Sequence, residues 1–306
     1  MISIVKPEIN IDFLGRRWIA FMLSSILILA SILSIVLKGG LNFGIDFAGG
    51  ALVQVRFTNE TTPGEIRKVL NEIGLRDSII QQYSEKGGDE YIIRFKNTSK
   101  NEGLSDRVQE TFQKRYGQNG FEIRRVEVVG PQVEKELRYK ALMALIYGMI
   151  GILVYIGFRF EFRFALGGVL ALVHDVTVTI GAFSITDREF TLPVLAAVLT
   201  IVGFSINDTI VIYDRIRENR RKMAGKKLEL IMNSSINETL SRTILTSGTV
   251  LFVVIALFIL GGSVIHDFAF ALIVGVIAGT YSTVFVASPI VLLWEKFFPG
   301  KKGKRR

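Results

Sequence analysis

Residues 192–219 read LPVLAAVLTIVGFSINDTIVIYDRIREN, and this stretch decides how the rest of the chain is interpreted. Most of it is an apolar run long enough to cross a bilayer. Asn207, Asp208 and Thr209 lie inside that run, and a cluster of charges follows it. A carboxylate at membrane depth costs about 2.5–3.5 kcal/mol on insertion scales, so it persists mostly where it faces protein or water and has a function. Asp208 is therefore the first candidate functional residue.

The composition indicates apolar segments separated by polar blocks. The chain has 306 residues, of which 49% are hydrophobic, and the polar residues are concentrated in a few stretches. The absence of cysteine excludes disulfides, Cys-ligated zinc, iron–sulfur clusters and thiol nucleophiles. With only two histidines, His174 and His266, we expect no His-rich metal site and no cofactor. The net charge of +9 lies mostly beside apolar runs, which favours membrane orientation over nucleic-acid binding.

Six apolar runs predict six membrane-spanning helices. Residues 18–37 form an uncharged run preceded by Arg16 and Arg17, with Trp18 as an interfacial anchor. We interpret this run as an uncleaved anchor, because the alternative, a signal peptide, has an apolar core of only about 7–15 residues. The five further runs are 139–158, 164–185, 192–213, 244–260 and 268–294.

The charges between the runs predict which ends face the cytoplasm. Arginine and lysine are concentrated around 159–163, 215–242 and 295–306, whereas the opposite short loops carry only Arg188. Because short cytoplasmic loops are enriched in these residues, both termini are expected in the cytoplasm. The predicted parts are a cytoplasmic N-terminus (1–17), a first transmembrane helix (18–37), an extracytoplasmic domain (38–138), a five-helix transmembrane bundle (139–294) and a basic cytoplasmic tail (295–306).

The segment 38–138 has the composition of a soluble domain. Alternating apolar residues predict strands, helical spacing predicts helices, and Gly87 and Gly88 predict a turn. The expected elements are strands 52–57, 78–83, 90–95 and 121–129 and helices 63–73 and 104–116. Their βαββαβ order is the ferredoxin-like pattern. The predicted fold class is therefore a polytopic α-helical membrane protein, with six transmembrane helices and one ferredoxin-like α/β extracytoplasmic domain between the first two.

Three charged residues stand out within the apolar helices or at their rims: Asp175, Asp208 and Arg242. Helical spacing places Thr179 on the face of Asp175, and Thr246 and Thr249 on the face of Arg242. On the central helix, Thr200, Phe204 and Asp208 align, and Gly203 and Asn207 form the adjoining row. The sequence therefore predicts a polar seam in the cytoplasmic half of the bundle.

A carboxylate in such a seam can alternate between its protonated and ionised forms, as a proton relay requires. One charge moved across the membrane field gains about 2.3 kcal/mol per 100 mV, so a driving force exists. The alternative is that Asp208 pairs locally and only fixes helix packing, while Arg242 extends to the membrane interface. We interpret His266 as an ordinary outer-loop residue.

Two kinds of enzymatic site are not supported. Gly44 and Gly49 have the spacing of P-loop glycines, but Gly50 and Ala51 stand where Lys and Ser or Thr are needed. No serine–histidine–acid arrangement is indicated either, since His174 would have to act from inside a membrane helix. We therefore expect no ATP-driven motor and no enzyme.

Several stretches taken together resemble the SecF membrane proteins of the SecD/SecF family, in the RND superfamily. They run in family order over nearly the whole chain. They are FGIDFAGG (43–50), VGP (129–131), GFRFE (157–161), ALVHDV (171–176), SINDT (205–209), DRIREN (214–219), RT (242–243) and TSGT (246–249). Two positions depart from the family pattern. Phe204 stands where the family commonly has tyrosine before the Ser-x-Asn-Asp run, and Glu134 stands where a glycine usually follows Gly-Pro-x-Val.

The resemblance implies a subunit of the Sec protein translocase in the bacterial cytoplasmic (inner) membrane. SecD would supply a second six-helix half, and the pair would use the proton motive force to promote export of secreted polypeptides. The implied partners are SecD, the SecYEG channel, the translocating preprotein and membrane lipid, with YajC as a possible further partner.

By position, Asp208 matches the family's intramembrane carboxylate, Arg242 its arginine linked to proton passage, and Asp175 another acidic position. Asn207 and Thr209 flank the first of these. An alternative is a structural scaffold that stabilises SecD and the channel without conducting protons. A third interpretation, half of a small-molecule exporter, is weakened by the small size of the outer domain.

Overall fold

The computed structural model describes residues 10–75, 78–83, 89–95 and 104–298. The chain divides into two compact units. Unit 1 comprises Met1–Asn42, Met143–Arg188 and Pro193–Arg306, and unit 2 comprises Phe43–Leu142 and Glu189–Leu192. The expected turn at Gly87 and Gly88, and the outer parts of the predicted N-terminus and tail, lie outside the described residues. The predicted domain boundaries stay predictions.

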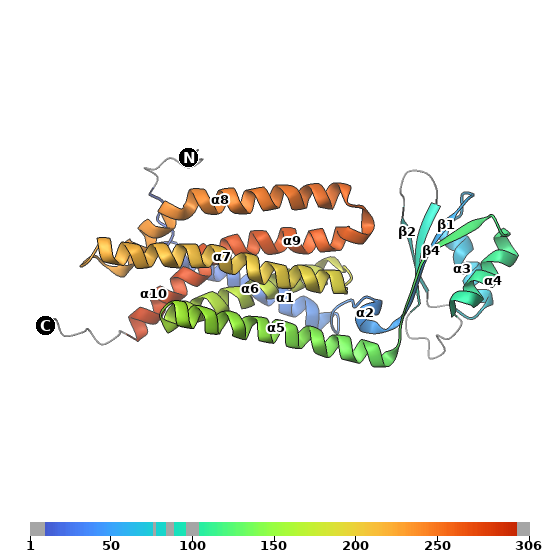
Figure 1. The fold of residues 1–306 in the computed structure, drawn as a ribbon, viewed down its shortest axis with the longest axis horizontal. Coiled ribbons are helices and arrows are strands. Elements are labelled where there is room, and N and C mark those ends of the chain that lie inside the picture. The colour runs from blue at the N-terminus through green and yellow to red at the C-terminus, as the bar shows by residue number, and fades with distance from the viewer. Residues whose placement is uncertain (1–9, 76–77, 84–88, 96–103, 299–306) are drawn as a thin grey trace. The chain divides into compact units, whose positions relative to one another are not determined.

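The α/β part of unit 2, in its described residues, is a four-stranded antiparallel sheet with two helices (Figure 1). Its elements are β1 (Gly50–Phe57), α3 (Pro63–Glu72), β2 (Ser78–Tyr83), β3 (Asp89–Phe95), α4 (Leu104–Tyr116) and β4 (Phe121–Val129). The strand order is β2-β3-β1-β4, with every neighbouring pair antiparallel. The predicted ferredoxin-like βαββαβ arrangement is confirmed.

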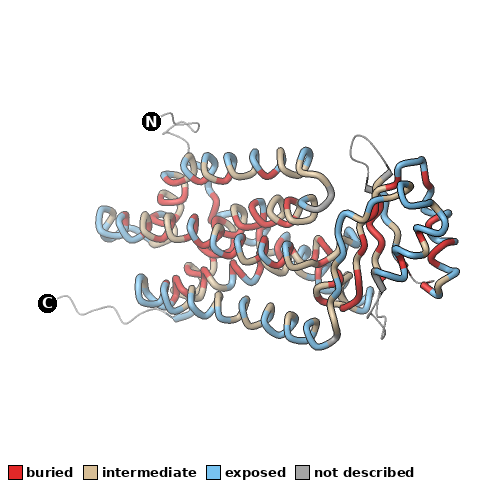
Figure 2. Tube along the Cα trace, turned by 45° about the vertical axis from the view of Figure 1, so that its right-hand side comes forward, coloured by how far each residue is buried: buried red, intermediate tan, exposed pale blue. Residues whose placement is uncertain are grey.

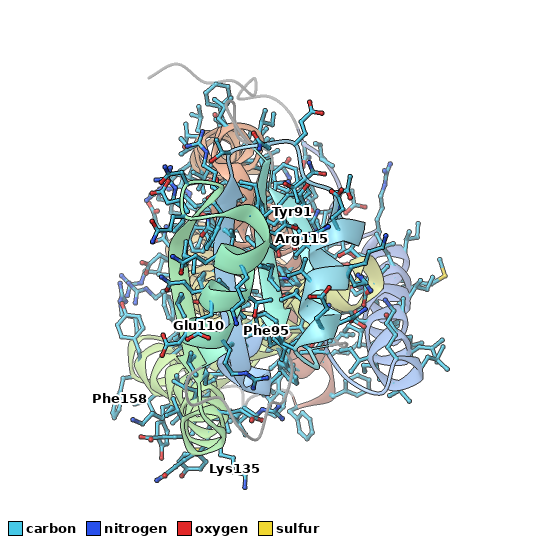
Figure 3. The ribbon with its side chains drawn as sticks, turned by 90° about the vertical axis from the view of Figure 1, so that its right-hand side faces the viewer. Tyr91, Phe95, Glu110, Arg115, Lys135 and Phe158 are labelled. Carbon is cyan, nitrogen blue, oxygen red and sulfur yellow. The ribbon has the colours of Figure 1, made fainter. Side chains whose placement is uncertain are left out.

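The core of unit 2 forms because β1 alternates buried and partly exposed residues. Its inward side chains pack with residues of β3, α3 and α4, and Figure 3 labels Tyr91 and Phe95 from this layer. The start of α3 is fixed by a capping box, in which Thr62 and Glu65 satisfy each other's backbone N–H groups. Local sequence and burial therefore agree in this unit.

Within the described residues, six helices are long and apolar enough to cross a membrane, so the chain is a multi-pass membrane protein. The helical elements are α1 (Arg17–Leu37), α5 (Pro131–Arg159), α6 (Phe162–Thr186), α7 (Leu192–Lys222), α8 (Leu228–Leu260), α9 (Gly262–Ser282), the π-helical turn η1 (Thr283–Ala287) and α10 (Ser288–Phe297). The last three form one continuous apolar span. Pro289 cannot donate a backbone hydrogen bond, which favours an interruption at this point in the last span.

Several helices extend beyond the apolar runs that predicted them. The run 192–213 lies in a helix that ends at Lys222, and the run 244–260 in one that begins at Leu228. Apolar residues mark only the part of a helix that lies in lipid, whereas Glu, Lys and Arg continue a helix readily outside it. The four-residue helix α2 (Ile45–Ala48) was not predicted.

Burial separates the spanning helices into central and peripheral ones (Figure 2). In α6 and α7, 56% of the most apolar window is buried, against 6% in α5 and 17% in α8. Exposed large apolar side chains such as Phe158 and Phe252 lie on these peripheral helices. The helix that carries Asp208 is therefore in the interior of unit 1.

The charges of unit 1 pair at the two ends of its helices. At one end the pairs are Arg17–Glu229, Arg159–Asp214, Arg163–Glu295 and Arg220–Glu161. At the other end the pairs are Lys38–Asp187 and Arg188–Asp267. His266 begins the second turn of α9, stacked on Phe258, so it lies in a helix and not in the expected loop.

Candidate functional site

Asp208 is held by hydroxyl groups from a neighbouring helix. Its side chain is buried in α7, with 4% of the residue exposed. Thr246 Oγ1 donates to Oδ1 at 3.5 Å and Ser247 Oγ donates to Oδ2 at 3.2 Å, both from α8. Thr280 of α9 donates in turn to Ser247 at 2.9 Å. Across the described parts of the chain, Asp208 forms no ion pair with a cationic side chain.

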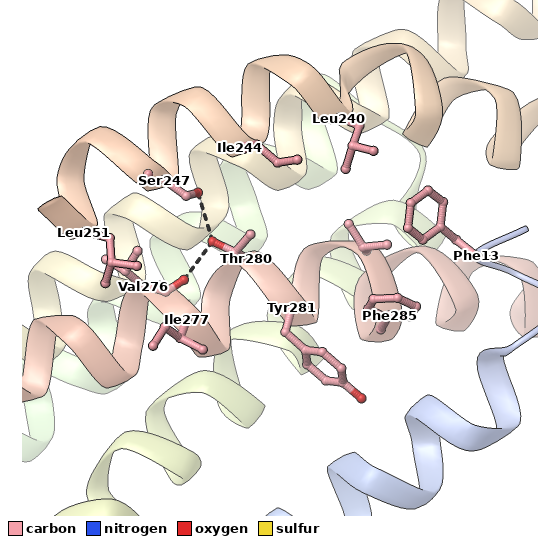
Figure 4. A pocket seen from close by; sticks show the side chains of 12 residues that line it. Phe13, Leu240, Ile244, Ser247, Leu251, Val276, Ile277, Thr280, Tyr281 and Phe285 are labelled. Carbon is pink, nitrogen blue, oxygen red and sulfur yellow. Dashed lines mark hydrogen bonds between the residues drawn. The ribbon is translucent and has the colours of Figure 1, made fainter. Parts of the chain in front are cut away.

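An apolar cavity of about 420 Å³ borders this chain of hydroxyls, between α8 and α9 (Figure 4). Ser247 and Thr280 are part of its wall, but Thr280 Oγ1 lies within hydrogen-bond distance of both Ser247 Oγ and the carbonyl of Val276, which share its single proton. Because these hydroxyls are already engaged, the cavity presents mainly apolar surface. Asp208 is not among the residues that line the cavity, and Ser247 is the residue that links the two.

Asp175 of α6 lies in a second, tighter polar cluster. Its exposure is 1%. Ser205 of α7 and Ser282 of α9 donate to Oδ2 at 2.6 and 2.8 Å. His174 Nδ1 lies 3.0 Å from Oδ1, although helical spacing alone directed the two side chains apart. This carboxylate ties three helices together.

Helix α7 lies between the two clusters. Ser205 faces Asp175, and Asp208 follows three residues later facing α8. Thr209 is 1% exposed and shares a 3.0 Å hydrogen bond with Thr283. The two carboxylates thus have different partners, and among the described residues no hydrogen bond joins them directly into the single seam that the sequence predicted.

The small residues of α9 allow this close packing against α7. A Cβ on Gly275 would lie 2.1 Å from Ile201, and a Cβ on Gly279 would lie 3.0 Å from the Cβ of Ser205. The spacing Gly275–Gly279 indicated a packing surface, and the structure places it against the helix that carries Asp208.

The remaining predicted residues lie on exposed faces of the helices. Thr200, Gly203 and Asn207 are exposed on α7. Each residue turns a helix by about 100°, so Asn207 lies on a different face from its neighbour Asp208. Arg242 is exposed on α8, and its backbone carbonyl lies 3.0 Å from Thr246 Oγ1, where it competes with Asp208 for the single hydroxyl proton. Their roles in proton transfer stay predictions.

Sequence reasoning missed four hydroxyl groups, those of Ser205, Ser247, Thr280 and Ser282. Serine and threonine in apolar helices usually bond to their own backbone, so their presence alone carries little information. Ser247 could have been found, since it follows Thr246 on a helix already singled out. Adjacent helix positions turn His174 about 100° from Asp175, yet its side chain contacts Asp175 and stacks on Tyr281.

These features define a polytopic membrane protein with buried ionisable groups and an α/β domain inserted after its first spanning helix. The family model described as "Protein export membrane protein SecD/SecF, C-terminal" matches residues 107–297, and the "SecD/SecF GG Motif" matches residues 35–61. The chain belongs to the SecD/SecF family, as one of its SecF members.

Named relatives support this assignment over nearly the whole length. The "Protein translocase subunit SecF" of Magnetococcus marinus is 49% identical, with 96% of this chain and 94% of that protein covered. The one of Vibrio alginolyticus is 43% identical, with coverages of 95% and 92%.

Among solved structures, the crystal structure of SecDF, a translocon-associated membrane protein from Thermus thermophilus, has a TM-score of 0.83 at 35% identity. The match covers 96% of this chain and 40% of the SecDF chain, so this chain spans well under half of that protein.

Proposed function

We propose that this protein is an accessory subunit of the Sec protein translocase that uses the proton motive force, together with SecD, to promote export of secreted polypeptides. The names of the relatives support the translocase role, because they are described as translocase subunits and SecDF as translocon-associated. The observation that carries the proton-driven role is the surroundings of Asp208.

Asp208 is buried and its hydrogen-bond partners are neutral hydroxyls. A hydroxyl can donate to an ionised carboxylate and can accept from a protonated one, so both forms of Asp208 find partners in the same site. A tight ion pair would instead hold the carboxylate in its ionised form. Arg242 lies one helical turn before Thr246, where its charge is available to the Asp208 site if α8 shifts.

The orientation follows from the charged ends of unit 1. The basic end, with Arg163 and Arg220, would face the cytoplasm of a bacterial inner membrane. Asn207 and Thr200 lie on an exposed face of α7, where a second six-helix half supplied by SecD would cover them. The SecYEG channel, YajC, the preprotein and surrounding lipid complete the proposed set of partners.

The test is Asp208→Asn in inverted membrane vesicles that contain the assembled translocase. Proton-gradient-dependent translocation of a secreted precursor should be lost, while the amount of assembled complex stays normal. The matched control is Asp214→Asn, which changes an exposed carboxylate of the same helix that pairs with Arg159 and Arg217. Gradient-dependent translocation at the wild-type level in the Asp208 variant would contradict the proposal.

A structural scaffold is the second candidate, and the Asp175 cluster favours it. That carboxylate bridges α6, α7 and α9 through short hydrogen bonds, as a packing device would. On this alternative, Asp208→Asn lowers the yield and thermal stability of the complex more than the translocation rate per complex. Measuring both quantities in the same preparation separates the two functions.

A further inference from the structure

The segment 43–47 and the short loop 189–192 are joined within unit 2. Gly44 N donates to the carbonyl of Phe190 at 3.0 Å, and Phe43 and Phe190 form an isolated parallel bridge. A Cβ at Gly44 would lie 2.7 Å from the methyl group of Thr191, so glycine allows this close approach. Two segments far apart in the sequence thus pair through their backbones.

Aromatic side chains fill the space around this pairing. The rings of Phe43, Phe47 and Phe190 lie with centroids 5.8–6.2 Å apart. Phe47 is 2% exposed and Phe190 is 6% exposed. Arg138 places its guanidinium 4.9 Å from the centre of the Phe43 ring and donates to the carbonyl of Phe47. Buried aromatic side chains of this size dominate the stability of a contact.

Asp46 fixes the loop to the start of α7. Its Oδ2 accepts the backbone N–H of Leu192, the first residue of α7, at 2.9 Å. The first N–H groups of a helix have no partner within the helix and favour a negative charge, so a carboxylate here caps α7 from a distant segment. Pro193 follows, at a position where proline suits a helix start.

A further ion pair ties the same loop to the sheet. Arg94 of β3 and Glu189 lie 2.6 Å apart, and their side chains are only 18% and 13% exposed. The loop 189–192 between α6 and α7 is therefore held by residues 43–44, by α2 and by β3, all inside unit 2.

We propose that these contacts, which we call the outer clasp (Phe43, Asp46, Phe47, Phe190 and Leu192), transmit displacement of α7 to the α/β domain. All five residues belong to unit 2, and the unbroken helix continues from Leu192 to Asp208, about 24 Å along its axis at 1.5 Å per residue. A continuous helix is stiff over this length. Asp46 is then a positioning residue for the outer end of the helix that carries the titrating group.

The inference rests on the proposed proton-driven function, and the absence of cysteine in the chain makes it directly testable. In Phe43→Cys/Phe190→Cys, the aromatic contacts are lost, but the bridge brings the two positions close enough for a disulfide. With the thiols reduced, proton-gradient-dependent translocation should fall about fivefold or more, in the range of typical coupling between sites. Oxidation should restore it, and a reductant should abolish it again.

A matched control pair is Leu52→Cys/Glu127→Cys, which joins partner residues of β1 and β4 away from the clasp. Oxidation or reduction of this pair should leave gradient-dependent translocation unchanged. A role of the clasp in folding alone would not give reversible recovery in complexes that are already assembled.

Asp46→Ala and Asp46→Asn provide a second test that needs no disulfide. Asp46→Ala should reduce gradient-dependent translocation per assembled complex, and Asp46→Asn, which keeps an acceptor oxygen, should reduce it less. Gradient-dependent translocation at the wild-type level in Asp46→Ala, or in the reduced cysteine pair, would contradict the proposed role of the outer clasp. Failure of the proposed function gives a different result, in which the wild-type chain itself shows no gradient-dependent component.

Discussion

Two carboxylates in neighbouring central helices, Asp175 and Asp208, are both buried but are held in different ways. Asp175 has three partners at 2.6–3.0 Å, drawn from α6, α7 and α9. Asp208 has two hydroxyl partners, at 3.2 and 3.5 Å, both from α8. Burial alone therefore does not identify a proton carrier. Asp175 has more and shorter hydrogen bonds, as the packing role would require, whereas the fewer and longer ones of Asp208 suit the titrating role proposed for it.

The largest expected effect is that of Asp175→Ala on stability. It leaves Ser205, Ser282 and His174 without their partner in a buried site, and each unsatisfied polar group costs about 1–3 kcal/mol. We expect a loss of about 3 kcal/mol or more in the free energy of unfolding, measured by thermal denaturation of the purified protein. Asp208→Ala should cost about 1 kcal/mol, since its hydrogen bonds are fewer and longer. A larger loss of unfolding free energy in Asp208→Ala than in Asp175→Ala would contradict the distinction drawn between the two carboxylates.

Arg242→Ala should affect function and leave stability nearly unchanged. Its side chain is exposed, so the stability change should stay within about 0.5 kcal/mol. If its charge acts on Asp208, gradient-dependent translocation should fall about tenfold, which equals about 1.4 kcal/mol. Arg242→Lys keeps the charge and should retain part of the activity. Equal loss in both variants would instead assign the effect to the guanidinium geometry.

Ser247→Ala tests the hydroxyl chain from Asp208 to Thr280. It removes one hydrogen bond to the carboxylate and one from Thr280, and typical bonds contribute about 1 kcal/mol net. We expect a stability loss of about 1 kcal/mol in thermal denaturation, together with reduced gradient-dependent translocation. Gly248→Ala, on an exposed position beside it with open space for a Cβ, is the control: it should leave translocation unchanged and should not lower stability, because alanine favours a helix over glycine. Gradient-dependent translocation at the wild-type level in Ser247→Ala would show that the Ser247 hydroxyl has no part in proton transfer.

The smallest effect concerns Glu161, a carboxylate that is paired and lies between α5 and α6. Burial acts to raise the pKa of Glu161, but the hydrogen bond from Arg220 and the charges of Arg163 and Arg220 outweigh it, so this pKa lies below its ordinary value of 4.5. Its stabilising contribution is present above pH 4.5 and is lost as the pH falls through the lowered pKa.

Glu161→Gln should remove this part of the acid sensitivity, and unfolding temperatures measured between neutral pH and pH 3 would show it. The side chain is 57% exposed, so solvent screening limits the effect to under about 1 kcal/mol. An unchanged acid response in Glu161→Gln would show that other carboxylates account for it.

The sequence predicted the bounds of the helices and strands more accurately in unit 2 than in unit 1. Strands 78–83 and 121–129 and the helix 104–116 agree with the structure at both ends, because alternation, helical spacing and turns each act locally. In unit 1, apolar runs predicted six spans, but the helices extend into charged segments that hydropathy does not register. Residue type singled out Asp208 and Asp175 for the candidate site; their roles stay predictions, and the structure gives the two carboxylates different partners.

Residue chemistry alone determined that a carboxylate at position 208 is costly in lipid, and that glycines at 275 and 279 suit close helix packing. It also determined the ferredoxin-like order of the α/β domain. Only the tertiary structure decided which partners each carboxylate has, because a helix face fixes direction but not which helix lies opposite. The cap that Asp46 places on α7 depends likewise on two segments about 146 residues apart. Such contacts arise from the packing of whole elements, and no local pattern encodes them.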